Sequence, residues 1–172
     1  MSVRYEQAEA LMNAIGLYTI LARYDPLFVG TLPIDVDIPG SDIDIICKVE
    51  EPPAFIQLLE ENYGDQRDFE IHPPTVEMPY IVCRFTCLSF EIEIFGQDMP
   101  VKDQNAWRHM EAERKLLSIG GEAAREKIRA LKRSGLKTEP AFAEYFKIDG
   151  DPYEVLLEIS DMTLSEILSA YG

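Results

Sequence analysis

The chain has 172 residues, of which 47% are hydrophobic, so it can build a buried core and is not an intrinsically disordered chain. Its formal net charge of −15 argues against a surface that binds long nucleic acid. No apolar run approaches the roughly 18 residues that span a bilayer, and the N-terminal sequence lacks a signal-peptide core. We therefore expect a cytoplasmic protein that does not contact a membrane.

The N-terminal third predicts an interrupted helix and two strands. Apolar side chains recur at helical spacing over residues 4–23, where Gly16 is placed to divide the helix. Apolar runs at 27–29 and 41–49 predict strands, joined by a connector over 31–40. The second run is apolar at nearly every position outside its acids, which is typical of a central strand buried on both faces.

The middle of the chain predicts one helix and more strands. Residues 52–63 follow the helical pattern, and strand-like runs lie at 69–71, 80–86 and 88–95. The last two runs are placed to form a hairpin. Cys47, Cys83 and Cys87 are interpreted as buried free thiols, because no further ligands complete a zinc site around the CxxxC spacing.

From residue 102 onward the pattern is helical throughout. Gly120–Gly121 breaks the first run, Thr138 is the expected cap of a later helix, and Thr163 with Glu166 forms a capping box. The predicted helices cover 102–118, 121–133, 139–146 and two segments starting at 152 and 164. This order predicts an α+β fold: a small mixed sheet with flanking helices in residues 1–100, and a helical region in 101–172 packed on it as one compact unit.

Charge is unevenly distributed along the chain. Half of the sixteen basic residues lie within residues 114–137, which carry a net charge of +6 and leave −21 for the remainder. Two interpretations stay open: a solvated helix face, or a local anion site opposite an acidic metal site.

Asp42 and Asp44 are the leading candidates for chemistry. In a strand, side chains two residues apart project from the same face, about 7 Å from each other. Both acids are embedded in isoleucines, where an unpaired charge is costly, and no Lys or Arg lies within that run before Lys48. A bound Mg²⁺ ion is the simplest way to compensate the charge of the two carboxylates. The nearby Gly30–Thr31 pair could hold a phosphate.

A third carboxylate is available on a later strand. Glu91 and Glu93 alternate with apolar residues, and we prefer Glu93 because Ile94 and Phe95 follow it. The competing interpretation is an edge strand with a polar outer face.

The pattern of Gly30–Thr31, a spacer, Ser41-Asp42-Ile43-Asp44 and a later acid resembles the signature of the DNA polymerase β-like nucleotidyltransferase superfamily. Later runs around residues 93–97, 104–109 and 135–142 resemble a bacterial family of unknown function within that superfamily. The resemblance implies a nucleotidyltransferase-like fold with the sheet and helices outlined above.

The resemblance also implies residue roles. Asp42, Asp44 and Glu93 would be the catalytic carboxylates and metal ligands, with up to two Mg²⁺ ions, and Glu91 is a second choice for the third acid. Gly30, Thr31 and Ser41 would bind the triphosphate of a nucleoside triphosphate. The implied reaction transfers a nucleoside monophosphate to a hydroxyl of a small molecule or protein that the sequence does not identify.

Three features of the sequence depart from the signature. Thr31 stands where Ser is usual, the connector carries Asp35 and Asp37 beside the expected phosphate site, and the third acid is Glu where Asp is usual. Thr31 keeps the hydroxyl, but the acidic connector and the Glu favour an alternative function: a catalytically degenerate member of the fold that binds a nucleotide or a partner protein. A metal-dependent hydrolase built on the same carboxylates is a further alternative.

The helical half adds weaker candidates. Asn105, His109 and Glu113 recur every four residues and share a helix face, so His109 could contact phosphate or act as an acid–base oriented by Glu113. Lys137 could bind phosphate as a point charge. The alternative for His109 is a structural hydrogen bond. The alternative for Lys137 is a residue that only precedes a helix.

Overall fold

The computed structural model describes residues 2–172 and separates them into two compact units. The first unit consists of the chain up to Pro33 together with Gly40–Gln104. The second consists of Ile34–Pro39 and Asn105–Gly172. Most of the predicted connector therefore belongs with the helical half. Within residues 2–172, no helix is both long and apolar enough to cross a membrane.

Two helices open the first unit. α1 (Val3–Ala14) begins at Ser2, whose hydroxyl accepts a hydrogen bond from the Tyr5 amide. Gly16 has φ of 69°, a left-handed conformation that costs glycine little, and α2 (Leu17–Ile20) follows it. The predicted division of the first helix at Gly16 is confirmed.

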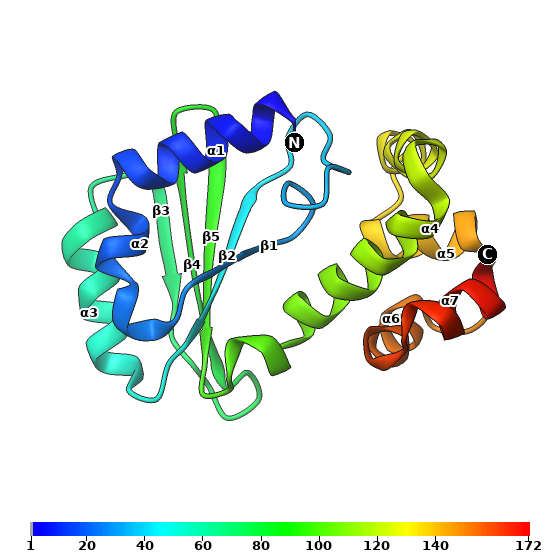
Figure 1. The fold of residues 1–172 in the computed structure, drawn as a ribbon. Coiled ribbons are helices and arrows are strands. Elements are labelled where there is room, and N and C mark those ends of the chain that lie inside the picture. Colours follow the sequence, from blue (N-terminus) through cyan, green and yellow to red (C-terminus); the bar gives the residue numbers. More distant parts are fainter. Residues whose placement is uncertain (1) are drawn as a thin grey trace. The chain divides into compact units, whose positions relative to one another are not determined.

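Within the described residues, one mixed sheet carries all five strands, in the order β1-β2-β5-β4-β3 (Figure 1). The strands are β1 (Leu27–Val29), β2 (Ile43–Lys48), β3 (Arg67–His72), β4 (Tyr80–Cys87) and β5 (Phe90–Gln97). β2 runs parallel to β5, and the other neighbours are antiparallel. The predicted hairpin is formed by β4 and β5. β5 is the central strand of the sheet, and β2 lies between β5 and β1.

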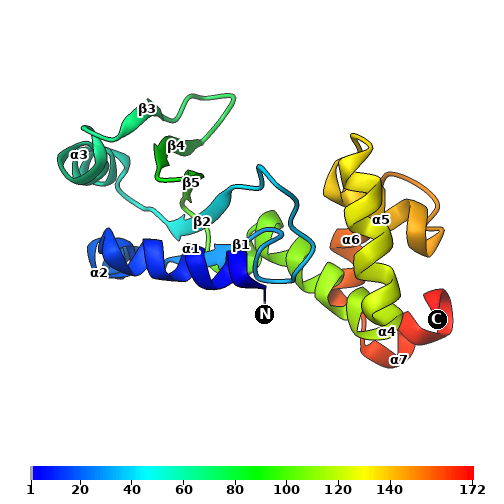
Figure 2. The same cartoon turned by 90° about the horizontal axis from the view of Figure 1, so that it is seen from above.

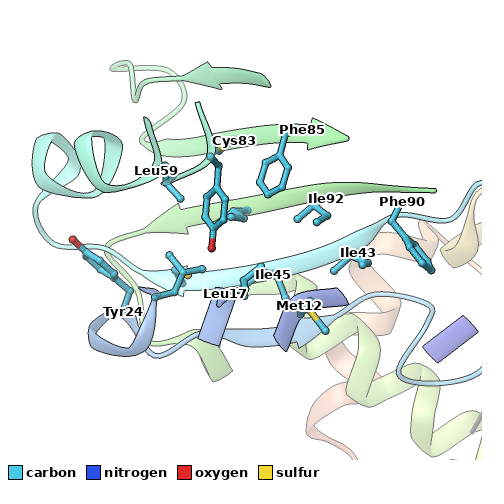
Figure 3. Close-up of a cluster of buried hydrophobic side chains, with 14 of the residues drawn as sticks. Met12, Leu17, Tyr24, Ile43, Ile45, Leu59, Cys83, Phe85, Phe90 and Ile92 are labelled. Atoms are coloured by element: carbon cyan, nitrogen blue, oxygen red, sulfur yellow. The ribbon is translucent and has the colours of Figure 1, made fainter. Parts of the chain in front are cut away.

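The core of the first unit lies on one face of this sheet. α1, α2 and α3 (Pro52–Tyr63) lie on the same side of it (Figure 2), and their apolar residues join those of the strands in one buried cluster. Figure 3 shows Met12, Leu17 and Leu59 of the helices facing Ile45 and Ile92 of the strands. Because strand side chains alternate between faces, the residues directly before and after each of these isoleucines point to the opposite face of the sheet.

The cysteines are free thiols, as predicted. Cys47 and Cys83 are buried, and Cys87 is half-buried. Burial raises the pKa of the Cys47 thiol to about 12, with a contribution from Asp25, and burial raises that of Cys83 to about 12 as well. These two side chains therefore serve as small apolar groups in the core.

The second unit is helical. α4 (Asn105–Arg133) is interrupted at Gly121, whose φ of 62° and ψ of −152° are not helical, so the predicted break is confirmed. α5 (Thr138–Phe146), α6 (Pro152–Asp161) and α7 (Leu164–Tyr171) follow, and the Thr163–Glu166 capping box is present. The expected cap at Thr138 is wrong. Lys137 occupies that position because its carbonyl already accepts from the Ala141 amide.

Candidate active site

A row of paired residues crosses the face of the sheet opposite the core. The strand registers place Asp44 directly beside Val29 on one side and Glu93 on the other. Glu93 in turn pairs with Arg84, and Arg84 with Glu70. Residues directly opposite each other on neighbouring strands share a face, with Cβ atoms about 5 Å apart. The row therefore brings the two predicted carboxylates together and adds a guanidinium beside them.

Gly30 fits tightly against Asp44. Gly30 follows β1 with φ of 81°, and a Cβ atom built on it would lie 2.2 Å from Oδ2 of Asp44. Only glycine allows this approach. The predicted phosphate-binding pair, Gly30–Thr31, is thus brought against one of the predicted metal ligands by the β1–β2 pairing.

Asp42 lies just outside the strand. β2 begins at Ile43, two residues later than predicted, so the argument from strand alternation applies to Asp44 but not strictly to Asp42. Asp42 is half-buried. The backbone carbonyl of Ser41 accepts a hydrogen bond of 3.0 Å from the Arg4 guanidinium, which ties the entry to β2 to helix α1.

Glu93 is already bound to a cation. Nε and Nη2 of Arg84 lie 2.7 and 2.5 Å from the same carboxylate oxygen, Oε2. The hydrogen bond to Glu93 raises the pKa of Arg84, against the effect of desolvation, and Glu91 and Glu70 add to it. The sequence-based prediction considered only cations on the strand that carries Asp42 and Asp44, and Arg84 lies on a different strand, β4. The register of the predicted hairpin, counted outward from the turn at residues 88–89, pairs Arg84 with Glu93.

Glu91, the second choice for the third acid, is exposed and lies opposite Thr86. The Thr86 hydroxyl donates a hydrogen bond of 3.0 Å to Asp68 on β3. Glu91 shares the face of Glu93 because it is two residues away on the same strand.

The fit of these residues to Mg²⁺ can be judged from their chemistry. Two carboxylates completed by substrate phosphates are a usual Mg²⁺ environment, which Asp42 and Asp44 match. Glu93 does not match it as placed, because Arg84 occupies it. Among residues 2–172, no group of three or more His, Cys, Asp or Glu side chains is arranged to hold a metal ion.

His109, Glu113 and Lys137 belong to the second unit. The ring nitrogens of His109 lie 2.8 Å from the Tyr153 carbonyl oxygen and 3.6 Å from Oε1 of Glu139. The expectation that Glu113 orients this ring is wrong, since Glu139 and Tyr153 do so. Burial would by itself raise the pKa of Glu139, but the hydrogen bond from His109 and its own helix backbone leave that pKa below its usual value.

Glu113 is buried inside the second unit. Burial raises the pKa of Glu113 well above its usual value, Glu139 raises it further, and Lys132 opposes the shift. The face shared by Asn105, His109 and Glu113 thus runs from an exposed residue into the interior of the helical unit. Lys137 is exposed, immediately before α5.

Part of the basic segment holds the connector. Arg129 Nη2 lies 2.9 Å from a carboxylate oxygen of Asp35 and donates to the carbonyl oxygen of the same residue at 2.5 Å. The Lys132 ammonium donates to the Val36 carbonyl at 3.1 Å. Asp37 is buried. The negative charge of Asp35, which the sequence placed beside a phosphate site, is therefore compensated by Arg129.

The fold is that of the nucleotidyltransferases. The chain matches a cytoplasmic RNA terminal U-transferase with a TM-score of 0.60 and 13% identity, over 91% of this chain and 46% of that one. It matches the Cid1 poly(U) polymerase bound to MgGTP with a TM-score of 0.59 and 14% identity, over 91% and 49%. It matches the GLD-2/RNP-8 structure with a TM-score of 0.56 and 11% identity, over 99% and 77%.

The chain spans about half the length of the first two structures, and identities this low establish the fold alone. By sequence, the chain belongs to the family described as Domain of unknown function (DUF4269), whose model matches residues 10–159. No curated protein matches the chain.

Proposed function

We propose that this protein is a Mg²⁺-dependent nucleotidyltransferase that transfers a nucleoside monophosphate from a nucleoside triphosphate to a hydroxyl of a small molecule or protein. The observation that carries the proposal is the approach of Gly30 to Asp44, where a Cβ would fall 2.2 Å from the carboxylate. This closeness supports the proposal, because the backbone of the turn would bind phosphate next to a carboxylate that would bind the metal. The Mg²⁺-nucleotide complexes of Cid1 support this choice of ligand.

The proposal gives each residue a limited task. Asp42 and Asp44 would hold Mg²⁺, which supplies neutralisation of the pyrophosphate leaving group when bound. The backbone at Gly30–Thr31, with Ser41, would orient the triphosphate for in-line attack by the acceptor hydroxyl. Glu93 beside Asp44 would be a further ligand or a base if Arg84 releases it.

The test measures binding and turnover separately. Each of the four α-labelled nucleoside triphosphates is dialysed against the protein with Mg²⁺, and pyrophosphate release and labelled products are then followed. Asp44→Asn and Asp42→Asn are expected to abolish turnover and to weaken Mg²⁺-dependent binding at least tenfold. Asp65→Asn, at an exposed aspartate outside the site, is the matched control. Full turnover in both site variants would refute the proposal.

A catalytically degenerate nucleotide-binding or partner-binding protein is the second candidate, and the Arg84–Glu93 ion pair favours it. It predicts binding that depends on Asp44 without any pyrophosphate release. A hydrolase would instead release phosphate or pyrophosphate with water as the only acceptor, and no labelled adduct would form.

A further inference from the structure

Positive and negative charges alternate along part of the row that crosses the sheet. Asp44 and Glu93 are neighbours on β2 and β5, and Arg84 of β4 lies beyond Glu93. On the far side of Arg84 lies Glu70 of β3. A pair of adjacent carboxylates needs compensating positive charge, and here one guanidinium already supplies part of it.

Arg84 is well placed to keep this position. It is held in the eight-residue ladder between β4 and β5, and two of its nitrogens contact one oxygen of Glu93. A guanidinium stays protonated at every pH at which a protein is folded, so its charge is permanent. The Glu93 side chain is 25% exposed, which limits the ability of water to replace Arg84 as a partner.

We infer that Arg84 takes the place of a second metal ion at Glu93, so that the site holds a single divalent cation, on Asp42 and Asp44. The inference rests on the proposed function, and it narrows the metal requirement of the site. A cation approaching Glu93 meets the like charge of Arg84 and competes for the same oxygen. Removing the guanidinium frees the carboxylate beside Asp44, and a second ion can then bind.

The experiment counts bound ions with Mn²⁺ alone, by the loss of the free-ion signal in electron paramagnetic resonance at saturating Mn²⁺. The wild type is expected to bind one ion per chain in the site and Arg84→Gln two. Arg84→Lys keeps the charge and is expected to bind one. The double variant Arg84→Gln/Glu93→Gln is expected to return to one, because the freed carboxylate is then absent.

Controls separate the site from the rest of the acidic surface. Ions that persist in an Asp42→Asn/Asp44→Asn/Glu93→Gln variant are subtracted as surface binding. Arg67→Gln, which removes an 80% exposed arginine from β3, is expected to leave the count unchanged. Circular dichroism shows whether each variant is folded. If Arg84→Gln is unfolded, the two single variants Arg84→Lys and Glu93→Gln carry the test.

Three outcomes overturn the inference. Two site ions in the wild type, or one in both wild type and Arg84→Gln, overturn it while leaving the proposed metal site intact. A fall from one ion to none in Glu93→Gln alone also overturns it, because Glu93 would then be an essential ligand. No site ion in any protein refutes the metal site of the proposed function together with this inference.

Discussion

At the scale of single residues, the contact between Gly30 and Asp44 couples two parts of the sequence that lie fourteen positions apart. The β1–β2 register fixes this contact, since Val29 pairs with Asp44. A side chain at position 30 would displace the Asp44 carboxylate. A change in the Gly30 backbone is therefore expected to move the Asp44 carboxylate as well.

Replacement of Gly30 by alanine tests this coupling. Gly30→Ala is expected to lower Mg²⁺-dependent nucleotide binding at least tenfold, because its Cβ would displace the Asp44 carboxylate. The measurement is equilibrium dialysis with labelled nucleoside triphosphates. Gly40→Ala is the matched control: Gly40 also has positive φ, at 92°, but its Cβ would have no neighbour within 4 Å. Equal losses in both variants would attribute the effect to backbone strain, about 1–2 kcal/mol at each position.

Glu113 gives a second prediction at this scale, one that depends on pH. The pKa of Glu113 is raised in the folded protein, so the unfolded chain loses this proton at lower pH than the folded one does. Stability is then lost as pH rises above the unfolded pKa of about 4.3 toward the folded value. Glu113→Gln removes the penalty, and its melting temperature is expected to exceed that of the wild type increasingly from pH 4 to pH 7.

Calorimetry at pH 4, 5.5 and 7 checks this expectation. A gain of at least about 2 °C at pH 7 corresponds to roughly 1 kcal/mol in a chain of this size. Glu126→Gln, at an exposed position of the same helix, is expected to show no such trend. A gain that is constant with pH would mean that the charge of Glu113 is not what destabilises the fold.

At the scale of elements, the connector between β1 and β2 is held by the helical half of the chain. Arg129 and Lys132 of α4 bind Asp35 and the Val36 carbonyl, and Ile34 and Val36 are buried. The segment between the Gly30–Thr31 turn and the Asp42–Asp44 segment is therefore ordered by residues from a distant helix.

Loss of Arg129 is expected to loosen this connector. In Arg129→Gln, the amides of residues 34–38 should exchange hydrogen at least fivefold faster, because the ion pair and the backbone contact are both lost. Hydrogen exchange with mass spectrometry measures the effect. Arg125→Gln, one turn earlier on the same helix, is the control. The effect on global stability should stay within about 1 kcal/mol, because the Asp35 side chain is partly exposed.

Local patterns were enough to predict most elements, whereas the expectation that Glu93 joins Asp44 depended on the resemblance to the nucleotidyltransferase signature. The Gly16 and Gly121 breaks and the last capping box depend on short-range chemistry that the sequence displays directly. The pairing of Arg84 with Glu93 depends on hairpin register, and the pairing of Arg129 with Asp35 joins residues 94 positions apart. No periodicity encodes such distant contacts, because they depend on how the whole chain folds.

At the scale of the whole molecule, the chain divides into two units that are not consecutive in sequence. Residues 34–39 leave the first unit, join the second, and the chain then returns at Gly40. A cut after residue 104 therefore removes the helices and also deprives the connector of its partners.

A fragment of residues 1–104 tests the importance of this arrangement. Ile34 and Val36 are 4% and 0% exposed in the full chain, and the fragment would expose them to water. The fragment is expected to bind the dye ANS more strongly than the full chain and to aggregate at lower concentration. Replacing Ile34 and Val36 by threonine in the fragment should reduce both effects. A fragment as monomeric and dye-free as the full chain would contradict this view.

The connector also has a consequence for the order of folding. During synthesis, Asp35 and Val36 leave the ribosome more than ninety residues ahead of Arg129 and Lys132, which later bind them. Contacts of such high sequence separation form late, because a long loop must close first. The sheet can assemble from residues up to 97 while the segment between its first two strands still lacks its final contacts. The connector between β1 and β2 therefore gains its final contacts only after the C-terminal helices have been made.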